Sequence, residues 1–276
     1  MIVQDNPNKV ITLQGKSVHN VKISSDSNEC GITAILVLPD KQILVADFKN
    51  KRVKLLDQQY QVVSHCSVTG YPWALCDITP SEVAVAVNET AKNIHEVQFI
   101  TVNNRQLVIG RKLQLQHACV GIAFHQGDMY ITAYTALYKY TLNGKLVSKM
   151  YEDTSDSNTV INCAVSRTGD KLYISNNTQH KLLTLARDGS VLATFTDHAL
   201  QAPTGIHVTP AGQVLVSGGG SNTILQVDSE GKRKLATLGT EEDGVVKPWS
   251  VCYNRHTASI IVGLEDQSSI LVFKVE

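Results

Sequence analysis

The chain has 276 residues, of which 43% are hydrophobic and 18% charged, a composition typical of globular proteins and not of disordered ones. Its 25 basic and 25 acidic residues give a formal net charge of zero, so it lacks the overall basicity of most nucleic-acid-binding proteins. No apolar stretch approaches the roughly 20 residues needed to cross a bilayer. Residues 1–10 lack the basic and apolar segments of a secretory leader, so we expect a cytoplasmic protein without a membrane contact.

The six cysteines form no C-x-x-C pair and have no histidine at zinc-finger spacing. Several lie inside apolar stretches, where a reduced cysteine packs as a small hydrophobic residue. Three disulfides are formally possible, but the missing leader favours reduced thiols. The cysteines are Cys30, Cys66, Cys76, Cys119, Cys163 and Cys252.

The first predicted element is a strand over residues 16–23, KSVHNVKI, which alternates polar and apolar residues. It is followed by six copies of one pattern, in which two short apolar segments flank a turn, as in TAILVLPDKQILVA. Successive copies start 40 to 47 residues apart, close to the ~40–45 residues of a four-stranded propeller blade. The positions that anchor the six copies are Ile35, Leu75, Ile122, Cys163, Ile206 and Val251.

Each copy continues with a third and a fourth predicted strand. The third strands start near Val53, Ile94, Leu137, Leu182, Ile224 and Ile270. Asn143-Gly144 and Asp188-Gly189 predict hairpin turns in which both residues have positive φ. Sustained helical periodicity is absent, so the sequence predicts an all-β, six-bladed β-propeller of four-stranded antiparallel blades.

The ends of the sequence indicate how the ring closes. The sixth copy stops after its third strand, ILVFKVE, and residues 16–23 are available to supply the missing fourth strand. Such pairing would remove two exposed sheet edges. Because no linker or change of composition divides the chain, we expect one domain over residues 1–276, with the closing strand inside residues 1–29.

Asp47, Asn50 and Arg52 form the most distinctive local pattern, in VADFKNKRV. The pattern decays in later copies, where Asn176, Gly218 and Leu264 take the place of Asp47. Asp and Asn commonly bind backbone N–H groups in turns, and Arg can bridge neighbouring segments. We therefore interpret these residues as a structural turn motif and not as a catalytic cluster.

This stretch resembles the NHL repeat, and the chain as a whole resembles the C-terminal propellers of animal tripartite-motif (TRIM) and B-box proteins. The matching pieces include PWALCDITPSEVAVAV, CVGIAF, DGSVLATF and SNTILQVDSEGK. The resemblance implies a recognition module for protein or RNA, beside RING, B-box and coiled-coil segments that supply ubiquitin-ligase activity and self-association. This chain has no cysteine/histidine array for a RING or B-box, so we expect no ligase chemistry of its own and a monomeric propeller.

The resemblance to propellers also raises an enzymatic alternative, because lactonase-like and lyase-like propellers hold a metal in the channel. Asp77, His125 and His207 lie on inner strands of the predicted ring. A metal site would need three or four such groups to converge on one point. A lone, buried Asp77 that binds backbone donors or an indole N–H is the commoner case, so we predict no metal, cofactor or catalytic residue.

A binding surface is expected on the rim where the loops between second and third strands and the loops between blades emerge together. Aromatic residues there can anchor a partner, and basic residues beside them can pair with single-stranded RNA. A shared packing role is the alternative for Trp73 and Trp249, which both follow a proline. The rim candidates are Phe48, Lys49, Lys51, Tyr71, Trp73, Tyr134, His180 and Trp249.

Three functions are therefore open from the sequence. The first is a non-catalytic module that recognises a protein partner or ubiquitination substrate in a TRIM-like ligase. The second is a propeller that binds single-stranded RNA, and the third is a metal-dependent lactonase-like or lyase-like enzyme.

Overall fold

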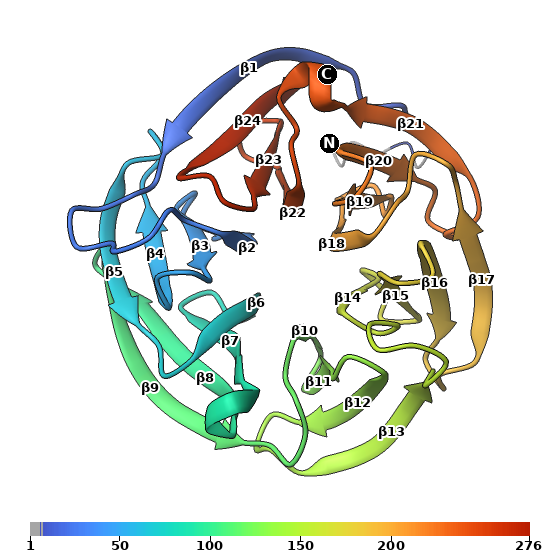
Figure 1. The fold of residues 1–276 in the computed structure, drawn as a ribbon, viewed down its shortest axis with the longest axis horizontal. Coiled ribbons are helices and arrows are strands. Elements are labelled where there is room, and N and C mark those ends of the chain that lie inside the picture. Colours follow the sequence, from blue (N-terminus) through green and yellow to red (C-terminus); the bar gives the residue numbers. More distant parts are fainter. Residues whose placement is uncertain (1–5, 7) are drawn as a thin grey trace.

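The computed structural model describes residue 6 and residues 8–276, so the expectation about residues 1–10 falls partly outside the described residues. Its strands form six four-stranded antiparallel sheets arranged as blades around a central channel (Figure 1). This confirms the predicted six-bladed β-propeller. Two short 3-10 turns, η1 (Thr90–Lys92) and η2 (Glu241–Asp243), are the helical elements of the described part. None of its helices is long and apolar enough to span a membrane.

The first three blades follow the chain from the inner strand to the outer strand. They comprise β2 (Ile32–Val37), β3 (Ile43–Asp47), β4 (Arg52–Leu56) and β5 (Val62–Ser67); β6 (Tyr71–Thr79), β7 (Glu82–Glu89), β8 (Ile94–Asn103) and β9 (Gln106–Gln114); and β10 (Gly121–His125), β11 (Asp128–Thr132), β12 (Ala136–Thr141) and β13 (Leu146–Glu152).

The last three blades include the one that closes the ring. They comprise β14 (Asn162–Val165), β15 (Lys171–Asn176), β16 (Lys181–Ala186) and β17 (Val191–Thr196); β18 (Pro203–Val208), β19 (Val214–Gly218), β20 (Thr223–Val227) and β21 (Lys234–Gly239); and β22 (Pro248–Asn254), β23 (Ser259–Leu264), β24 (Ser269–Val275) and β1 (Leu13–Asn20).

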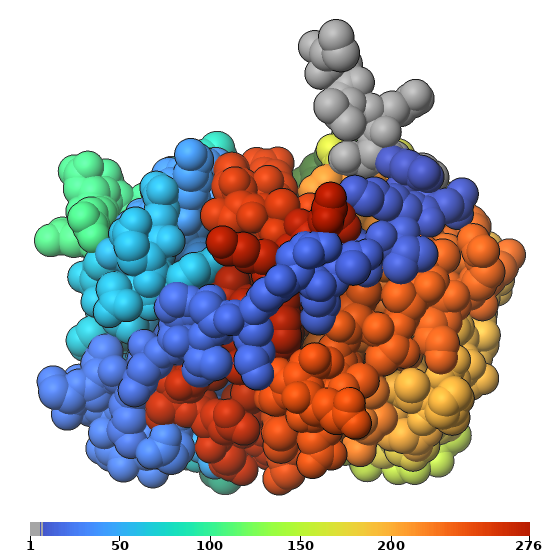
Figure 2. Space-filling model, turned by 90° about the horizontal axis from the view of Figure 1, so that it is seen from above, coloured from blue at the N-terminus to red at the C-terminus, as the bar shows by residue number. Residues whose placement is uncertain are grey.

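The ring closes through β1, which pairs antiparallel with β24 and places Ser17 opposite Val272. The predicted closing strand is confirmed, but it lies three residues earlier than residues 16–23. The N-terminal segment also continues onto the fifth blade, where the carbonyl of Lys9 accepts hydrogen bonds from the side chains of Gln213 (2.7 Å) and Gln226 (2.9 Å). In Figure 2 this segment, in blue, crosses the red sixth blade and the orange fifth blade.

The hydrophobic core is divided among the gaps between blades. Six buried clusters each join residues of two neighbouring blades. In one of them Ile35 and Val45 of the first blade pack with Cys252 and Ile261 of the last. The strands facing these clusters are apolar on both sides, as expected for sheets covered on both faces.

The hairpin turns differ in type from the prediction, and the cysteines are unpaired as expected. At the hairpins Gly144 and Gly189 have positive φ (83° and 92°), whereas Asn143 and Asp188 do not. The turns were therefore predicted at the right places with the wrong type, because each is a type I turn followed by a left-handed glycine. All six cysteines are free thiols, and burial raises the pKa of Cys163 and Cys252 to about 12.

Candidate functional site

Five aromatic side chains meet at one end of the channel, and we call them the aromatic rim: Phe48, Tyr71, Trp73, Tyr134 and Trp249. Phe48 is at their centre, stacked on Tyr71 with ring centroids 4.5 Å apart. It also contacts the edge of Trp73 at 4.9 Å and packs beside Trp249 at 5.2 Å. These separations match the offset and edge-to-face arrangements that aromatic pairs prefer.

The propeller topology explains why these residues converge although they come from four blades. Phe48 lies in the turn between β3 and β4, whereas Tyr71, Trp73 and Trp249 lie where the inner strands β6 and β22 begin. Trp73 reaches both Trp249 (6.3 Å) and Tyr134 (6.2 Å) edge-on. The loops between second and third strands and the starts of inner strands therefore share one face.

The rim is partly exposed and contains one unused donor. All five rings are half-buried, so they pack on one another and still present surface to solvent. The indole Nε1 of Trp73 is buried and has no hydrogen-bond partner among the described residues. Gly31 makes the close packing possible, because a Cβ there would lie 3.2 Å from Cζ3 of Trp249. Packing and exposure thus coexist at Trp73 and Trp249.

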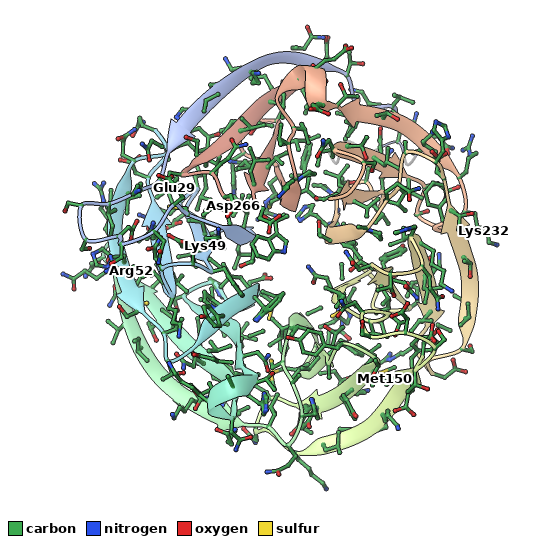
Figure 3. The ribbon with its side chains drawn as sticks, viewed as in Figure 1. Glu29, Lys49, Arg52, Met150, Lys232 and Asp266 are labelled. Atoms are coloured by element: carbon green, nitrogen blue, oxygen red, sulfur yellow. The ribbon has the colours of Figure 1, made fainter. Side chains whose placement is uncertain are left out.

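The two lysines of the predicted rim are neutralised by carboxylates. Lys51 lies 4.2 Å from the centre of the Tyr71 ring and 2.6 Å from Oε2 of Glu89, and this ion pair helps to hold the pKa of Glu89 below its usual value. Lys49 is paired with Asp266, and Figure 3 shows the two side by side near the channel. Glu89 also pairs with Lys92 (2.9 Å), so three lysines share two carboxylates and the positive surplus on this face is small.

His180 lies apart from the rim, in the turn between β15 and β16 of the fourth blade. Its Nδ1 accepts a hydrogen bond from the backbone N–H of Ala202 (3.0 Å), which ties the turn to the start of the fifth blade. The ring is exposed and makes no aromatic contact with the rim among the described residues. Seven of the eight candidates therefore gather in one part of this face, and His180 lies on the same face but apart from them.

The predicted turn motif anchors the first blade. Asp47 is fully buried; its Oδ1 accepts from the backbone N–H groups of Gly31 (3.3 Å) and Asn50 (3.4 Å), and its Oδ2 from the Asn50 side chain (2.9 Å). Arg52 points away from the channel (Figure 3) and reaches Oδ1 of Asp26 (3.2 Å) and the carbonyl of Ser25 (3.0 Å). The motif therefore ties the blade to the segment that links β1 to β2.

Lys54 is the centre of this network, and the sequence analysis missed it. Its ammonium lies 2.7 Å from Asp47 and 2.6 Å from Asp26, and all three side chains are fully buried. Burial opposes charge on both Asp47 and Lys54, but their hydrogen bonds and mutual attraction prevail, so the pKa of Asp47 is lowered and that of Lys54 raised. A lysine inside the otherwise apolar run VKLL was the available signal.

The same network contains the one group of metal-ligating side chains found in the described part of the chain, Asp26, Cys30 and Asp47. The Lys54 ammonium occupies their centre, because it also lies 3.4 Å from Sγ of Cys30. A divalent cation would have to displace a buried ion pair. We therefore interpret this group as structural.

The middle of the channel is narrow and uncharged. It contains a cavity of about 50 Å³, and all six anchor positions of the repeat line it. Its other lining residues are small or uncharged, among them Thr33, Asn162 and Ser250. No carboxylate or imidazole of the described residues lines this cavity. Such a lining does not favour a metal centre inside the channel.

Asp77, His125 and His207 lie at the opposite mouth, where they line a cavity of about 390 Å³. They do not form a metal-ligating group among the described residues. The expectation that Asp77 is buried is wrong, because its side chain is exposed and makes no hydrogen bond to Trp73. The residue stands at the end of β6, where the inner strand leaves the ring.

Comparison with known proteins supports the fold alone. No protein-family model and no curated protein matches the sequence. Among solved structures, a Bacteroides thetaiotaomicron protein of unknown function is 12% identical, with a TM-score of 0.71 over 95% of this chain and 76% of its own. An auxiliary nutrient binding protein of that organism is also 12% identical, with a TM-score of 0.72 over 90% of this chain and 70% of its own.

An enzyme is similar to the chain to the same degree. Virginiamycin B lyase from Staphylococcus aureus is 10% identical, with a TM-score of 0.67 over 94% of this chain and 99% of its own. Propellers with binding and with catalytic roles therefore share this fold, and function has to be argued from the residues of the two mouths.

Proposed function

We propose that the chain is a non-catalytic recognition module that binds a protein partner through the aromatic rim. The observation that carries the proposal is the meeting of five half-buried rings from four blades at one mouth. Rigid aromatic side chains lose little conformational entropy on binding and dominate many protein interfaces.

The charge at this mouth favours protein over RNA as the ligand. Lys49 and Lys51 each have a carboxylate partner, Asp266 and Glu89. Binding of single-stranded nucleic acid draws most of its affinity from unpaired cations that neutralise phosphates. The rim offers stacking surfaces with only a small surplus of positive charge, because Lys92 shares Glu89 with Lys51.

The finer proposal is that the partner is a substrate of a TRIM-like ubiquitin ligase whose RING and B-box domains lie outside this sequence. It rests on the resemblance of VADFKNKRV to the NHL repeat. A reducing compartment such as the cytoplasm agrees with the six free thiols.

The experiment that tests the proposal is selection of a random peptide library on the immobilised protein, followed by affinity measurements. Trp249→Ala and Tyr71→Ala should weaken the selected peptides by about tenfold or more. Tyr138→Ala is the matched control, because Tyr138 stacks on His117 away from the rim. Failure to enrich any peptide, or equal losses in all three variants, would contradict the proposal, and thermal melts establish that each variant is folded.

A further inference from the structure

The mouth opposite the aromatic rim is built differently. The cavity of about 390 Å³ lined by Asp77, His125 and His207 adjoins a groove of about 620 Å³ that runs outward beneath the fifth and sixth blades. The cavity and the groove share Arg167 and Arg255. Volumes of ~300–1,000 Å³ are typical of small-molecule sites. We call the cavity and the groove together the arginine mouth.

Arg167 and Arg255 occupy equivalent positions in their blades, and their guanidinium groups have few partners within the protein. Arg167 lies in the turn after the inner strand β14, and Arg255 in the turn after the inner strand β22. Arg167 donates one hydrogen bond, to the carbonyl of Pro210, and Arg255 has no hydrogen-bond or ion-pair partner in the part of the chain that the structure describes. Both side chains are exposed and line the cavity and the groove, so most of their N–H donors are available to a ligand.

Four other arginines have carboxylate neighbours, whereas Arg111 lies over the Phe99 ring and donates to the carbonyl of Leu142. Arg52 is paired with Asp26, Arg105 with Asp57 and Arg187 with Asp128. In a chain of zero net charge the arginine mouth is locally cationic, because three basic side chains line it, Lys9, Arg167 and Arg255. Its described lining contains two carboxylates, Asp77 and Glu276, and Glu276 already accepts a hydrogen bond from Gln14.

The inner part of the mouth is suited to neutral polar groups. Asp77 has a free carboxylate there, and His125 has a buried Nε2 without a partner among the described residues. Burial lowers the pKa of His207 to about 4, so its imidazole is neutral near pH 7 and offers one donor and one acceptor. A carboxylate and two imidazoles can bind hydroxyl groups, whereas Asp77 would repel a second anionic group placed beside it.

We propose that the arginine mouth binds a small polyhydroxylated molecule with one anionic group, either a phosphate or a carboxylate. Arg167 and Arg255 hold the anionic group through charge-assisted, forked hydrogen bonds. Asp77 accepts hydrogen bonds from hydroxyls at the other end, and the neutral imidazole of His207 donates one and accepts one. The narrow middle of the channel separates this mouth from the aromatic rim, so the inference is independent of protein recognition there.

Four probes separate the two halves of the site, each titrated into the full chain by calorimetry at constant ionic strength. They are sn-glycerol 3-phosphate, D-glycerate, inorganic phosphate and glycerol. Glycerol 3-phosphate or glycerate should bind about tenfold more tightly than inorganic phosphate, and glycerol alone should not bind measurably. The tighter of the two organic anions identifies the preferred anionic group.

Variants then assign the roles. Arg255→Ala should weaken the organic anion by about tenfold or more. Asp77→Asn should weaken it too, while binding of inorganic phosphate stays unchanged or tightens, because a negative charge is removed. Arg187→Ala, a matched exposed arginine on the fourth blade, should change neither affinity.

Three results would overturn the proposal: absence of binding by all four probes, equal affinity for every anion, or an Arg187→Ala effect as large as that of Arg255→Ala. Trp73→Ala separates the two mouths, since it should abolish selected peptides and leave the anion unaffected. Loss of both activities in that variant, with an unchanged thermal melt, would contradict the independence of the mouths.

Discussion

The ammonium of Lys54 lies 2.7 Å from Oδ2 of Asp47, and both side chains are fully buried. Asp47 simultaneously fixes the turn that carries Phe48, because it accepts hydrogen bonds from Asn50. Lys54 also binds Asp26, which lies in the link from the closing strand to the first blade. One buried cation thus connects ring closure with the turn at the centre of the aromatic rim.

Removing this cation should destabilise the fold strongly. Lys54→Met leaves two buried carboxylates without their partner, which typically costs about 3–5 kcal/mol of unfolding free energy. Urea denaturation measures the change. Lys149→Met is the control, because Lys149 pairs with Glu152 at 2.6 Å and both side chains are 44% exposed, and such pairs contribute about 1 kcal/mol or less. Similar losses in the two variants would show that the Lys54 network is not special.

The same network predicts a plateau in the dependence of stability on pH. The pKa of Asp47 is lowered in the fold, so its contribution is complete above the unfolded value of about 3.9 and is lost as pH falls through the folded pKa. The pKa of Lys54 is raised, so its contribution is complete below about 10.4 and is lost as pH rises through the folded pKa. Urea midpoints measured across pH should show both losses, and Asp47→Asn should reduce the acidic one, to which other carboxyl groups with lowered pKa values, such as Glu89, also contribute. A wild-type acid loss that persists unchanged in Asp47→Asn would contradict this assignment.

His207 adds a separate loss at mildly acidic pH. Burial lowers its pKa from 6.5 to about 4, so the unfolded chain binds this proton more readily than the fold between those values. Stability should therefore decrease as pH falls from about 6.5 to about 4, by up to a few kcal/mol. His207→Gln should flatten that part of the urea profile. His198→Gln is the control, because His198 is 92% exposed, and it should leave the profile as it is in the wild type.

The ring could be predicted from the sequence because a propeller repeats one local pattern. Ile35, Leu75 and the four other anchors recur at blade-length intervals, and all six line the narrow middle of the channel. Strand alternation and the incomplete last copy were enough to place the closing strand within a few residues. The anchors and the strand alternation are local patterns, and each blade carries the complete pattern within its own stretch of sequence.

The sites were harder to predict because they join residues of different blades. Phe48 and Trp249 are 201 positions apart in the sequence and meet through ring closure. Asp26 lies in a link without a repeated pattern, so its pairing with Lys54 had no local signal. Arg167 and Arg255 each look like ordinary turn residues, and their shared hollow appears only when the fourth and sixth blades are placed. The turn type at Asn143-Gly144 was mispredicted, because only Gly144 has a positive φ there and the two-residue turn would have needed it at both residues.

Removing the closing strand should lower the melting temperature sharply. A chain that begins at residue 21 lacks β1 and exposes the edge of β24, and a cost of several kcal/mol corresponds to roughly 10 °C or more in a protein of this size. Differential scanning calorimetry measures the shift. Gln226→Leu is the companion variant, since it loosens the segment around Lys9 on the fifth blade without touching β1. An unchanged melting temperature for the truncated chain would show that β1 is dispensable for closure.

Binding of single-stranded RNA should be weak, because the cations nearest the aromatic rim are already paired. Lys49 and Lys51 would have to leave Asp266 and Glu89 before they could neutralise phosphates. Fluorescence anisotropy with a random RNA pool at two salt concentrations should therefore detect no micromolar affinity at physiological ionic strength. The double variant Asp266→Asn/Glu89→Gln frees both lysines and should gain salt-sensitive binding. Micromolar binding by the wild-type chain that disappears in Lys49→Ala/Lys51→Ala would instead make RNA the ligand of the rim.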